Sequence, residues 1–243
     1  MAAQYQLEET TEAYSKIKHT FSRKILDKLE SYIPGESHVL EVGPGAGHFA
    51  RECVKRGYKY IAIDSSHVIR DKLKEMGIDV LDATIPPIPM EEKTVDLFFA
   101  SMVLEHMPTY IDAIGFIEEG KRVLKPNGII CLTFPNAYPN GKIFWEMDYT
   151  HSYFTTPRRV VQLCKHLGLD VIEVQKSIGW FWVHSTPLHD ILRHITNLFA
   201  GIINNSLIAG VLENIGLGGV LWKFRKTFFE SAIVLAKKSV QEK

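Results

Sequence analysis

The sequence predicts an α/β fold: a doubly wound sheet of about seven strands, most of them parallel, with helices on both faces. Two observations predict it. Short apolar runs alternate with amphipathic stretches over residues 39–134. A glycine-rich turn at residues 43–47 follows the first of these runs, where a strand gives way to a helix. Turns in this position at the carboxyl end of a first strand are typical of nucleoside sites.

The predicted elements follow one another in order. A helix over residues 10–32 has apolar side chains at every fourth position, and Pro34 with Gly35 ends it. Strands are predicted at 39–42, 60–63, 78–81, 95–100 and 129–134, and helices at 49–56, 68–76 and 110–124. The proline-rich stretch 85–89 must be a loop, and residues 125–128 (Lys-Pro-Asn-Gly) predict that a helix stops and the chain turns.

After the fifth strand the pattern changes. The remaining predicted elements are an aromatic-rich loop (135–156), a helix (157–167) and two strands (169–177 and 231–236). The segment between these two strands is apolar and far longer than a hairpin needs. The expected organisation is an N-terminal helical cap (1–36), an α/β domain (37–178 and 229–243) and an apolar helical insertion (179–228).

Composition excludes some classes of protein. The 28 basic residues (Lys and Arg) equal the 28 acidic ones, which argues against a nucleic-acid partner held by a strongly basic surface. The cysteines Cys53, Cys131 and Cys164 lie far apart, so we expect buried thiols and no metal site. The N-terminus lacks the apolar core of a signal peptide, which predicts a cytoplasmic protein.

The spacing of the glycines indicates which nucleoside ligand fits. In a dinucleotide site, which reads G-x-G-x-x-G, the third glycine lets a helix pack close to a strand, but here Gly47 comes one residue earlier. Glu41 lies two residues before Gly43, and a carboxylate there suits a cationic, amine-bearing ligand better than a pyrophosphate. Asp64 ends the second strand and can accept hydrogen bonds from both hydroxyls of a ribose.

The string Glu41-x-Gly43-x-Gly45-x-Gly47 with Asp64 resembles motif I and the acidic second-strand end of class I S-adenosylmethionine-dependent methyltransferases. Residues 94–106 resemble the fourth-strand motif of that family, and 122–129 its later turn. The resemblance implies a Rossmann-like sheet of order 3-2-1-4-5-7-6 with an antiparallel last strand. It also implies S-adenosyl-L-methionine as the cofactor.

The resemblance further implies where the cofactor is held. The implied cofactor-binding residues are Glu41, Gly43, Gly45, Gly47, Asp64, Ser65, Asp82, Ala83 and Ser101. Glu41 and the first glycines would hold the methionine part, Asp64 the ribose, Asp82 with Ala83 the adenine, and Ser101 the methionine end. Two alternatives stay open, since Glu41 could cap the turn and Asp82 could only begin a loop.

The candidate catalytic residues are Asp148, His151 and His106. Methyl transfer from a sulfonium depends mainly on alignment, and a general base helps where the acceptor keeps its proton, as a hydroxyl does. Asp148 and His151 follow the fifth strand in a segment that resembles one in small-molecule and sugar methyltransferases. If Asp148 orients His151, the imidazole can take that proton. Alternatively, the pair holds a loop together, and His106 only caps the next helix.

The insertion predicts two short helices broken near Asn204 and Asn205. They could form a lid over an apolar acceptor, the face of a homodimer, or a contact with a membrane surface.

The leading hypothesis is a methyltransferase that transfers a methyl group to an oxygen atom of a small organic acceptor, which could be apolar, lipid-like or a sugar. A nucleotide-dependent oxidoreductase is the second class, and the early Gly47 with Glu41 argues against it. A non-catalytic cofactor-binding protein of the same fold is the third. The intact set Glu41, Gly43, Gly45 and Asp64 argues against a site that has lost its ligand.

Overall fold

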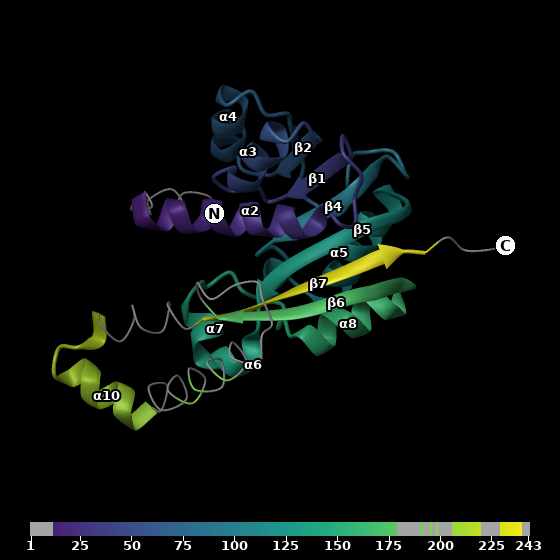
Figure 1. The fold of residues 1–243 in the computed structure, drawn as a ribbon. Helices are drawn as coiled ribbons and strands as arrows, with labels where there is room; N and C mark the ends of the chain where they lie inside the picture. Colours follow the sequence, from purple (N-terminus) through teal and green to yellow (C-terminus); the bar gives the residue numbers. More distant parts are fainter. Residues whose placement is uncertain are drawn as a thin grey trace.

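The computed structural model describes residues 12–178, 191, 195, 198, 206–219 and 229–239. A seven-stranded sheet of order β3-β2-β1-β4-β5-β7-β6 forms its centre (Figure 1). The strands are β1 (His38–Val42), β2 (Lys59–Asp64), β3 (Val80–Asp82), β4 (Val95–Ser101), β5 (Leu124–Pro135), β6 (Leu169–Ile178) and β7 (Glu230–Lys238). Strand β7 runs antiparallel to both of its neighbours, and the other pairings are parallel. The predicted fold class and strand order are confirmed.

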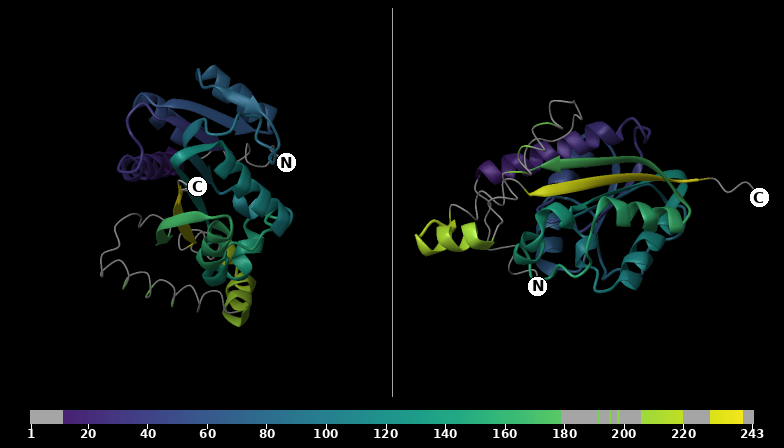
Figure 2. Two further views of the ribbon diagram at one scale, coloured as in Figure 1. Left: turned by 90° about the vertical axis from the view of Figure 1, so that its right-hand side faces the viewer. Right: turned by 90° about the horizontal axis from the view of Figure 1, so that it is seen from below.

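Helices cover both faces of this sheet (Figure 2). The described helices are α2 (Glu12–Leu29), α3 (His48–Lys55), α4 (His67–Glu75), the 3-10 helix η1 (Leu104–His106), α5 (Tyr110–Val123), α6 (Ala137–Asn140), α7 (Lys142–Glu146), α8 (Pro157–His166) and α10 (Ser206–Asn214). Side chains of α2, α3 and α4 pack into one buried cluster, and those of α5 and α8 into the other. The N-terminal helix α2 thus shares its core with the sheet.

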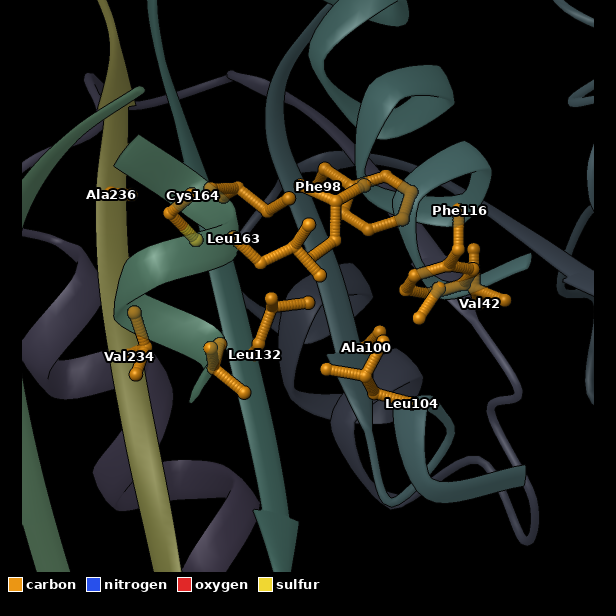
Figure 3. Packing of buried hydrophobic residues seen from close by; sticks show 14 of the residues in the cluster. Val42, Phe98, Ala100, Leu104, Phe116, Leu132, Leu163, Cys164, Val234 and Ala236 are labelled. Carbon is orange, nitrogen blue, oxygen red and sulfur yellow. The ribbon is translucent and has the colours of Figure 1, made fainter. Parts of the chain in front are cut away.

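The central strands are apolar at successive positions because both of their faces are buried. Along β4, Leu97 and Phe99 join the cluster under α2 and α3, whereas Phe98 and Ala100 join the cluster under α5 and α8. Phe98 meets Phe116 of α5 edge to face, with ring centroids 5.5 Å apart (Figure 3). This period of two fixes which strand residues point to each helical layer.

Strand β5 begins earlier than predicted. Leu124 pairs with Val95, and the register shifts before Ile129 pairs with Leu97. The predicted turn lies within this irregularity, where Asn127 takes a left-handed φ of 66°. The turn was therefore placed correctly. The strand starts before it because residues on both sides of the turn, Leu124 and Ile129, pair with β4.

The segment predicted as a loop over 135–156 contains the short helices α6 and α7. Asn140 fixes it to the start of β7: its Nδ2 donates to the Glu230 carbonyl at 2.8 Å, and its Oδ1 accepts from the Glu230 N–H at 2.9 Å. These bonds join residues far apart in the sequence, so no local pattern could predict them.

Helix α10 confirms the second predicted helix of the insertion, and most of the first lies outside the described residues. It lies beyond the ends of the strands, on the side of α6 and α7 (Figures 1 and 2). Its side chains Ile208 and Val211 are exposed, as is Ile215 just after it. Among the described helices, none has both the length and the apolar character needed to cross a membrane.

The three cysteines are free and buried, as predicted.

Candidate active site

The carboxyl ends of five parallel strands meet at one edge of the sheet. Asp64, the last residue of β2, lies opposite Asp82, the last residue of β3. Ser101 at the end of β4 lies opposite Thr133 of β5. In open α/β sheets this edge is where ligands bind. The fold thus brings the predicted site residues, which end or follow these strands, to a common edge.

Glu41 lies on β1 with 3% of its surface exposed. The Tyr60 hydroxyl donates a hydrogen bond to its carboxylate. Burial raises the pKa of Glu41 to about 8; the bond from Tyr60 lowers it, and the charge of Asp64 raises it further. Because burial disfavours the charged form, a cation beside this carboxylate would stabilise it. Glu41 is therefore suited to receive an ammonium group.

The three glycines of the turn have left-handed φ values of 68°, 53° and 70° at Gly43, Gly45 and Gly47. A Cβ added to Gly43 would lie 2.7 Å from Val103 Cγ2, and one added to Gly47 would lie 2.8 Å from Leu73 Cδ2. A Cβ on Gly45 would meet nothing within 4 Å. Gly43 and Gly47 are thus required for packing, whereas Gly45 borders open space that a ligand can enter. A cofactor contact of Gly47 stays a prediction.

Arg70 of α4 links the ends of β2 and β3. Its Nη1 donates to the Asp64 carbonyl at 3.0 Å, and its Nη2 donates to Asp82 Oδ2 at 2.8 Å. Asp64 Oδ1 accepts from the Ser66 N–H at 2.8 Å, which fixes the turn into α4. The second carboxylate oxygen of Asp64 can then serve ribose hydroxyls. Arg70 was not predicted from the sequence. Its guanidinium forms an ion pair with Asp82 and a hydrogen bond to the Asp64 carbonyl, so it joins the two strand ends.

The adenine-side predictions are less constrained. Ser65 is exposed, and the carboxylate of Asp82 is 70% exposed. Ala83 packs against the core. Their contacts with the cofactor stay predictions.

The chain turns sharply after β4. Ser101 shares a hydrogen bond with Thr133 Oγ1 at 2.7 Å, and the Met102 N–H donates to the Thr133 carbonyl at 2.9 Å. Met102 has a φ of 55°, which is uncommon for a residue with a side chain. Leu104 is buried near Ala100 (Figure 3). This anchored turn fixes the positions of Glu105 and His106, the two residues of η1 that follow Leu104.

The loop after α7 docks on η1 through the backbone. The carbonyl of Glu105 accepts from the N–H groups of Ser152 and Tyr153 at 2.8 and 2.9 Å. As a result the imidazoles of His106 and His151 lie with ring centroids 5.1 Å apart. The sequence analysis had named both histidines, and the structure brings them together.

Asp148 connects to His106 through Thr150. Asp148 Oδ1 accepts from the N–H and the hydroxyl of Thr150, at 2.9 and 2.6 Å. Because that hydroxyl has one proton, Thr150 Oγ1 must accept from His106 Nδ1, 2.8 Å away. The sequence analysis missed Thr150, and a direct orienting contact from Asp148 to His151 stays a prediction.

The environment of His106 favours the neutral form of its imidazole. Burial lowers its pKa, the charge of His151 lowers it further, and the charge of Asp148 opposes both. With its Nδ1 proton donated to Thr150, the neutral imidazole carries its lone pair on Nε2.

A sheet of this order, with a glycine turn after β1 and an acid ending β2, defines the class I methyltransferase fold. Residues 12–174 match the family described as "Methyltransferase domain", a range that covers more than half of the chain. The chain belongs to this methyltransferase family. The family predicted from the sequence, with its S-adenosylmethionine dependence, is thereby confirmed.

Individual relatives agree with this family. The chain is similar to an uncharacterized methyltransferase of Mycobacterium sp. (strain KMS), with 30% identity over 42% of this chain and 40% of that protein. It is also similar to the phosphoethanolamine N-methyltransferase of Triticum aestivum, with 25% identity over 72% of this chain and 40% of that protein. The chain thus spans about two fifths of the length of the curated relatives it matches.

Among solved structures, an S-adenosylmethionine-dependent methyltransferase from Archaeoglobus fulgidus superposes with a TM-score of 0.61. The match covers 97% of this chain and 100% of that one at 18% identity, and it supports the fold.

Proposed function

We propose that this protein transfers the methyl group of S-adenosylmethionine to a hydroxyl oxygen of a small organic acceptor. The observation that carries this proposal is the group of His106, Asp148 and His151 beside the carboxyl end of β4. A hydroxyl keeps its proton at neutral pH, so its methylation gains from a group that receives the proton. Two imidazoles with ring centroids 5.1 Å apart supply such a group.

The cofactor side follows from β1 and β2. Glu41 receives the ammonium group of the methionine part, Gly45 leaves room for the backbone to approach it, and Asp64 accepts from the ribose hydroxyls. Asp82, Ala83 and Ser65 border the adenine half, and Ser101 the methionine half. This assignment accounts for the buried carboxylate of Glu41 and for the open space beside Gly45 in the turn that follows β1.

On the acceptor side, the residues of this chain align the acceptor and receive its proton. The cofactor supplies a methyl group already activated on a sulfonium. Alignment of the acceptor oxygen with that methyl carries much of the rate. The acceptor proton passes to Nε2 of His151 or His106, and Asp148 stabilises the imidazolium of His106 through Thr150. Phe144 fixes the other ring, because its carbonyl accepts from His151 Nδ1.

Nitrogen is the second candidate for the acceptor atom. The relative from Triticum aestivum is named a phosphoethanolamine N-methyltransferase, and it matches more of this chain than the Mycobacterium relative does. An ammonium acceptor must also lose a proton before it attacks, so the same imidazoles would serve it.

The apolar insertion completes the proposal. Exposed Ile208, Val211 and Ile215 fit a lid over an apolar acceptor, a homodimer face, or a contact with a membrane surface. Light scattering across protein concentrations tests the dimer, and cosedimentation with phospholipid vesicles tests the membrane contact.

The decisive experiment has two stages. Titration calorimetry with S-adenosylhomocysteine and with NAD tests the cofactor, and binding of NAD alone would refute the proposal. A screen with methyl-labelled cofactor then compares matched pairs of acceptors that differ only in carrying a hydroxyl or an amine. Label in the hydroxyl members supports oxygen, and label in the amine members alone supports nitrogen. Binding without label in any acceptor contradicts catalysis.

A further inference from the structure

Three potential metal ligands converge at the acceptor side. Glu105, His106 and His151 each offer one ligand atom, and these atoms lie within 4.8 Å of one another. Within residues 12–178, 206–219 and 229–239, no other three histidine, cysteine or acidic side chains come together in this way. The cluster joins η1 to the loop that docks on it, so both of its parts are fixed by backbone hydrogen bonds.

The two histidines are oriented as metal-binding histidines usually are. His106 Nδ1 donates to Thr150 Oγ1, which in turn donates to Asp148. His151 Nδ1 donates to the Phe144 carbonyl. Histidines that bind metals commonly donate their second N–H to a carbonyl or a carboxylate, which fixes the tautomer and the direction of the ring. Both Nε2 lone pairs are therefore available for a proton or a cation.

Glu105 supplies an independent observation. Its side chain is 1% exposed, and its Oε2 has no hydrogen-bond partner within the described part of the chain. A buried carboxylate without a partner is costly unless a donor or a cation satisfies it. The structure thus places an incompletely satisfied carboxylate beside two oriented imidazoles.

We propose that Glu105, His106 and His151 bind a divalent first-row transition-metal ion. Two imidazoles and one carboxylate suit Zn²⁺, Mn²⁺, Fe²⁺ or Co²⁺, whereas Mg²⁺ prefers an all-oxygen set. Bonds of about 2.0–2.2 Å put two ligand atoms at most about 4 Å apart. The ligand atoms, now within 4.8 Å of one another, would therefore move together by about 1 Å around the ion.

Three protein ligands leave a coordination position open for the acceptor. An acceptor hydroxyl bound there loses its proton to water more readily, because the ion lowers its pKa. The cation then occupies the Nε2 lone pairs of His106 and His151, which would otherwise receive the proton. It therefore replaces the histidines as the group that activates the acceptor hydroxyl. This consequence for catalysis rests on the proposed methyl transfer, whereas binding of the ion does not.

The test uses the full chain freed of metal with EDTA and dialysed. Calorimetry with Zn²⁺ and Mn²⁺, and visible absorption with Co²⁺, should show one ion bound per chain. Glu105→Gln and His151→Ala should lose this binding, and Thr150→Val should weaken it about 10–100-fold through the orientation of His106. Glu118→Gln and His166→Ala, which change exposed residues of α5 and α8, are matched controls and should bind as the unmodified chain does.

Melting curves show whether each variant is folded, and Thr150→Val keeps the test informative if Glu105→Gln does not fold. No binding of any of the three ions, or equal binding by folded Glu105→Gln, would overturn the site. If S-adenosylhomocysteine binds and methyl transfer survives EDTA, the proposed role of the ion in catalysis fails and the proposed function stands. If the ion binds but no acceptor is methylated, the site stands and the proposed function fails.

Discussion

The two halves of the proposed active site are built differently. On the cofactor side, Glu41, Gly45 and Asp64 belong to one continuous strand-turn-helix-strand unit. On the acceptor side, η1 and the loop carrying His151 are distant in the sequence and meet through bonds from Ser152 and Tyr153 to Glu105. A local site can be predicted from its spacing, whereas an assembled site needs the fold to show which residues touch.

The two halves share one electrostatic feature. Each contains a buried glutamate, Glu41 or Glu105, whose pKa is raised to about 8 chiefly by burial. Glu41 accepts a bond from Tyr60, but Glu105 Oε2 has no such donor among the described residues. A cation would satisfy both carboxylates: an ammonium group on the cofactor side and a metal ion on the acceptor side.

The largest effect is expected at Gly45. Gly45→Val should abolish binding of S-adenosylhomocysteine, because the new side chain enters the open space beside the turn. The matched control is Gly57→Val. Gly57 also has a left-handed φ and open space around it, but it precedes the start of β2, whereas Gly45 follows the carboxyl end of β1. Both variants carry a similar backbone strain of roughly 1–2 kcal/mol. Calorimetry should find binding only in the Gly57 variant, and binding by both would remove Gly45 from the site.

On the acceptor side, His151→Ala should lower turnover by about 10²–10⁴, the usual contribution of a group that handles a proton. The affinity for S-adenosylhomocysteine should not change, because His151 lies outside the cofactor half. Asp148→Asn should have a smaller effect on turnover, since it acts through Thr150. A structural role gives another pattern: a lower melting temperature, with activity regained on cooling. Near-normal turnover in folded His151→Ala would shift the assignment to His106.

Asp64 should have an intermediate effect on the cofactor half alone. Asp64→Ala should weaken S-adenosylhomocysteine binding by roughly 1.5–3 kcal/mol, the range for hydrogen bonds to a charged group. Asp71→Ala, an exposed position on α4, is the control. Calorimetry of both variants provides the comparison. Equal affinities would show that the Asp64 carboxylate serves only the turn at Ser66.

The smallest expected effect is the release of a proton from Glu41 when S-adenosylhomocysteine binds. Since the pKa of Glu41 is about 8, most of this carboxyl is protonated in the free protein at pH 7. An ammonium group favours the ionised form, so binding of S-adenosylhomocysteine should release up to about one proton. Affinity should rise with pH up to about 8 and then level off. Calorimetry in buffers of different ionisation enthalpy measures the release, and Glu41→Gln should eliminate it. Uptake of a proton would contradict the contact.

The sequence by itself determined the sheet and the choice of residues proposed for the cofactor half. Apolar runs, turn residues and the spacing from Glu41 to Asp64 are local properties, and parallel strands must bring their carboxyl ends to one edge. The sequence also predicted Asp148 and His151 as a pair and His106 as a separate candidate.

Only the tertiary structure decided how the acceptor half is assembled. The left-handed turn at Met102, the docking of the His151 loop on Glu105, and the link from Asp148 through Thr150 to His106 all depend on contacts between distant segments. The burial of Glu105 also depends on such contacts. In the sequence, Glu105 follows an apolar run and looks like a residue that caps a helix. Burial and the partners of a polar group are set by how elements pack, and no local pattern in the chain encodes them.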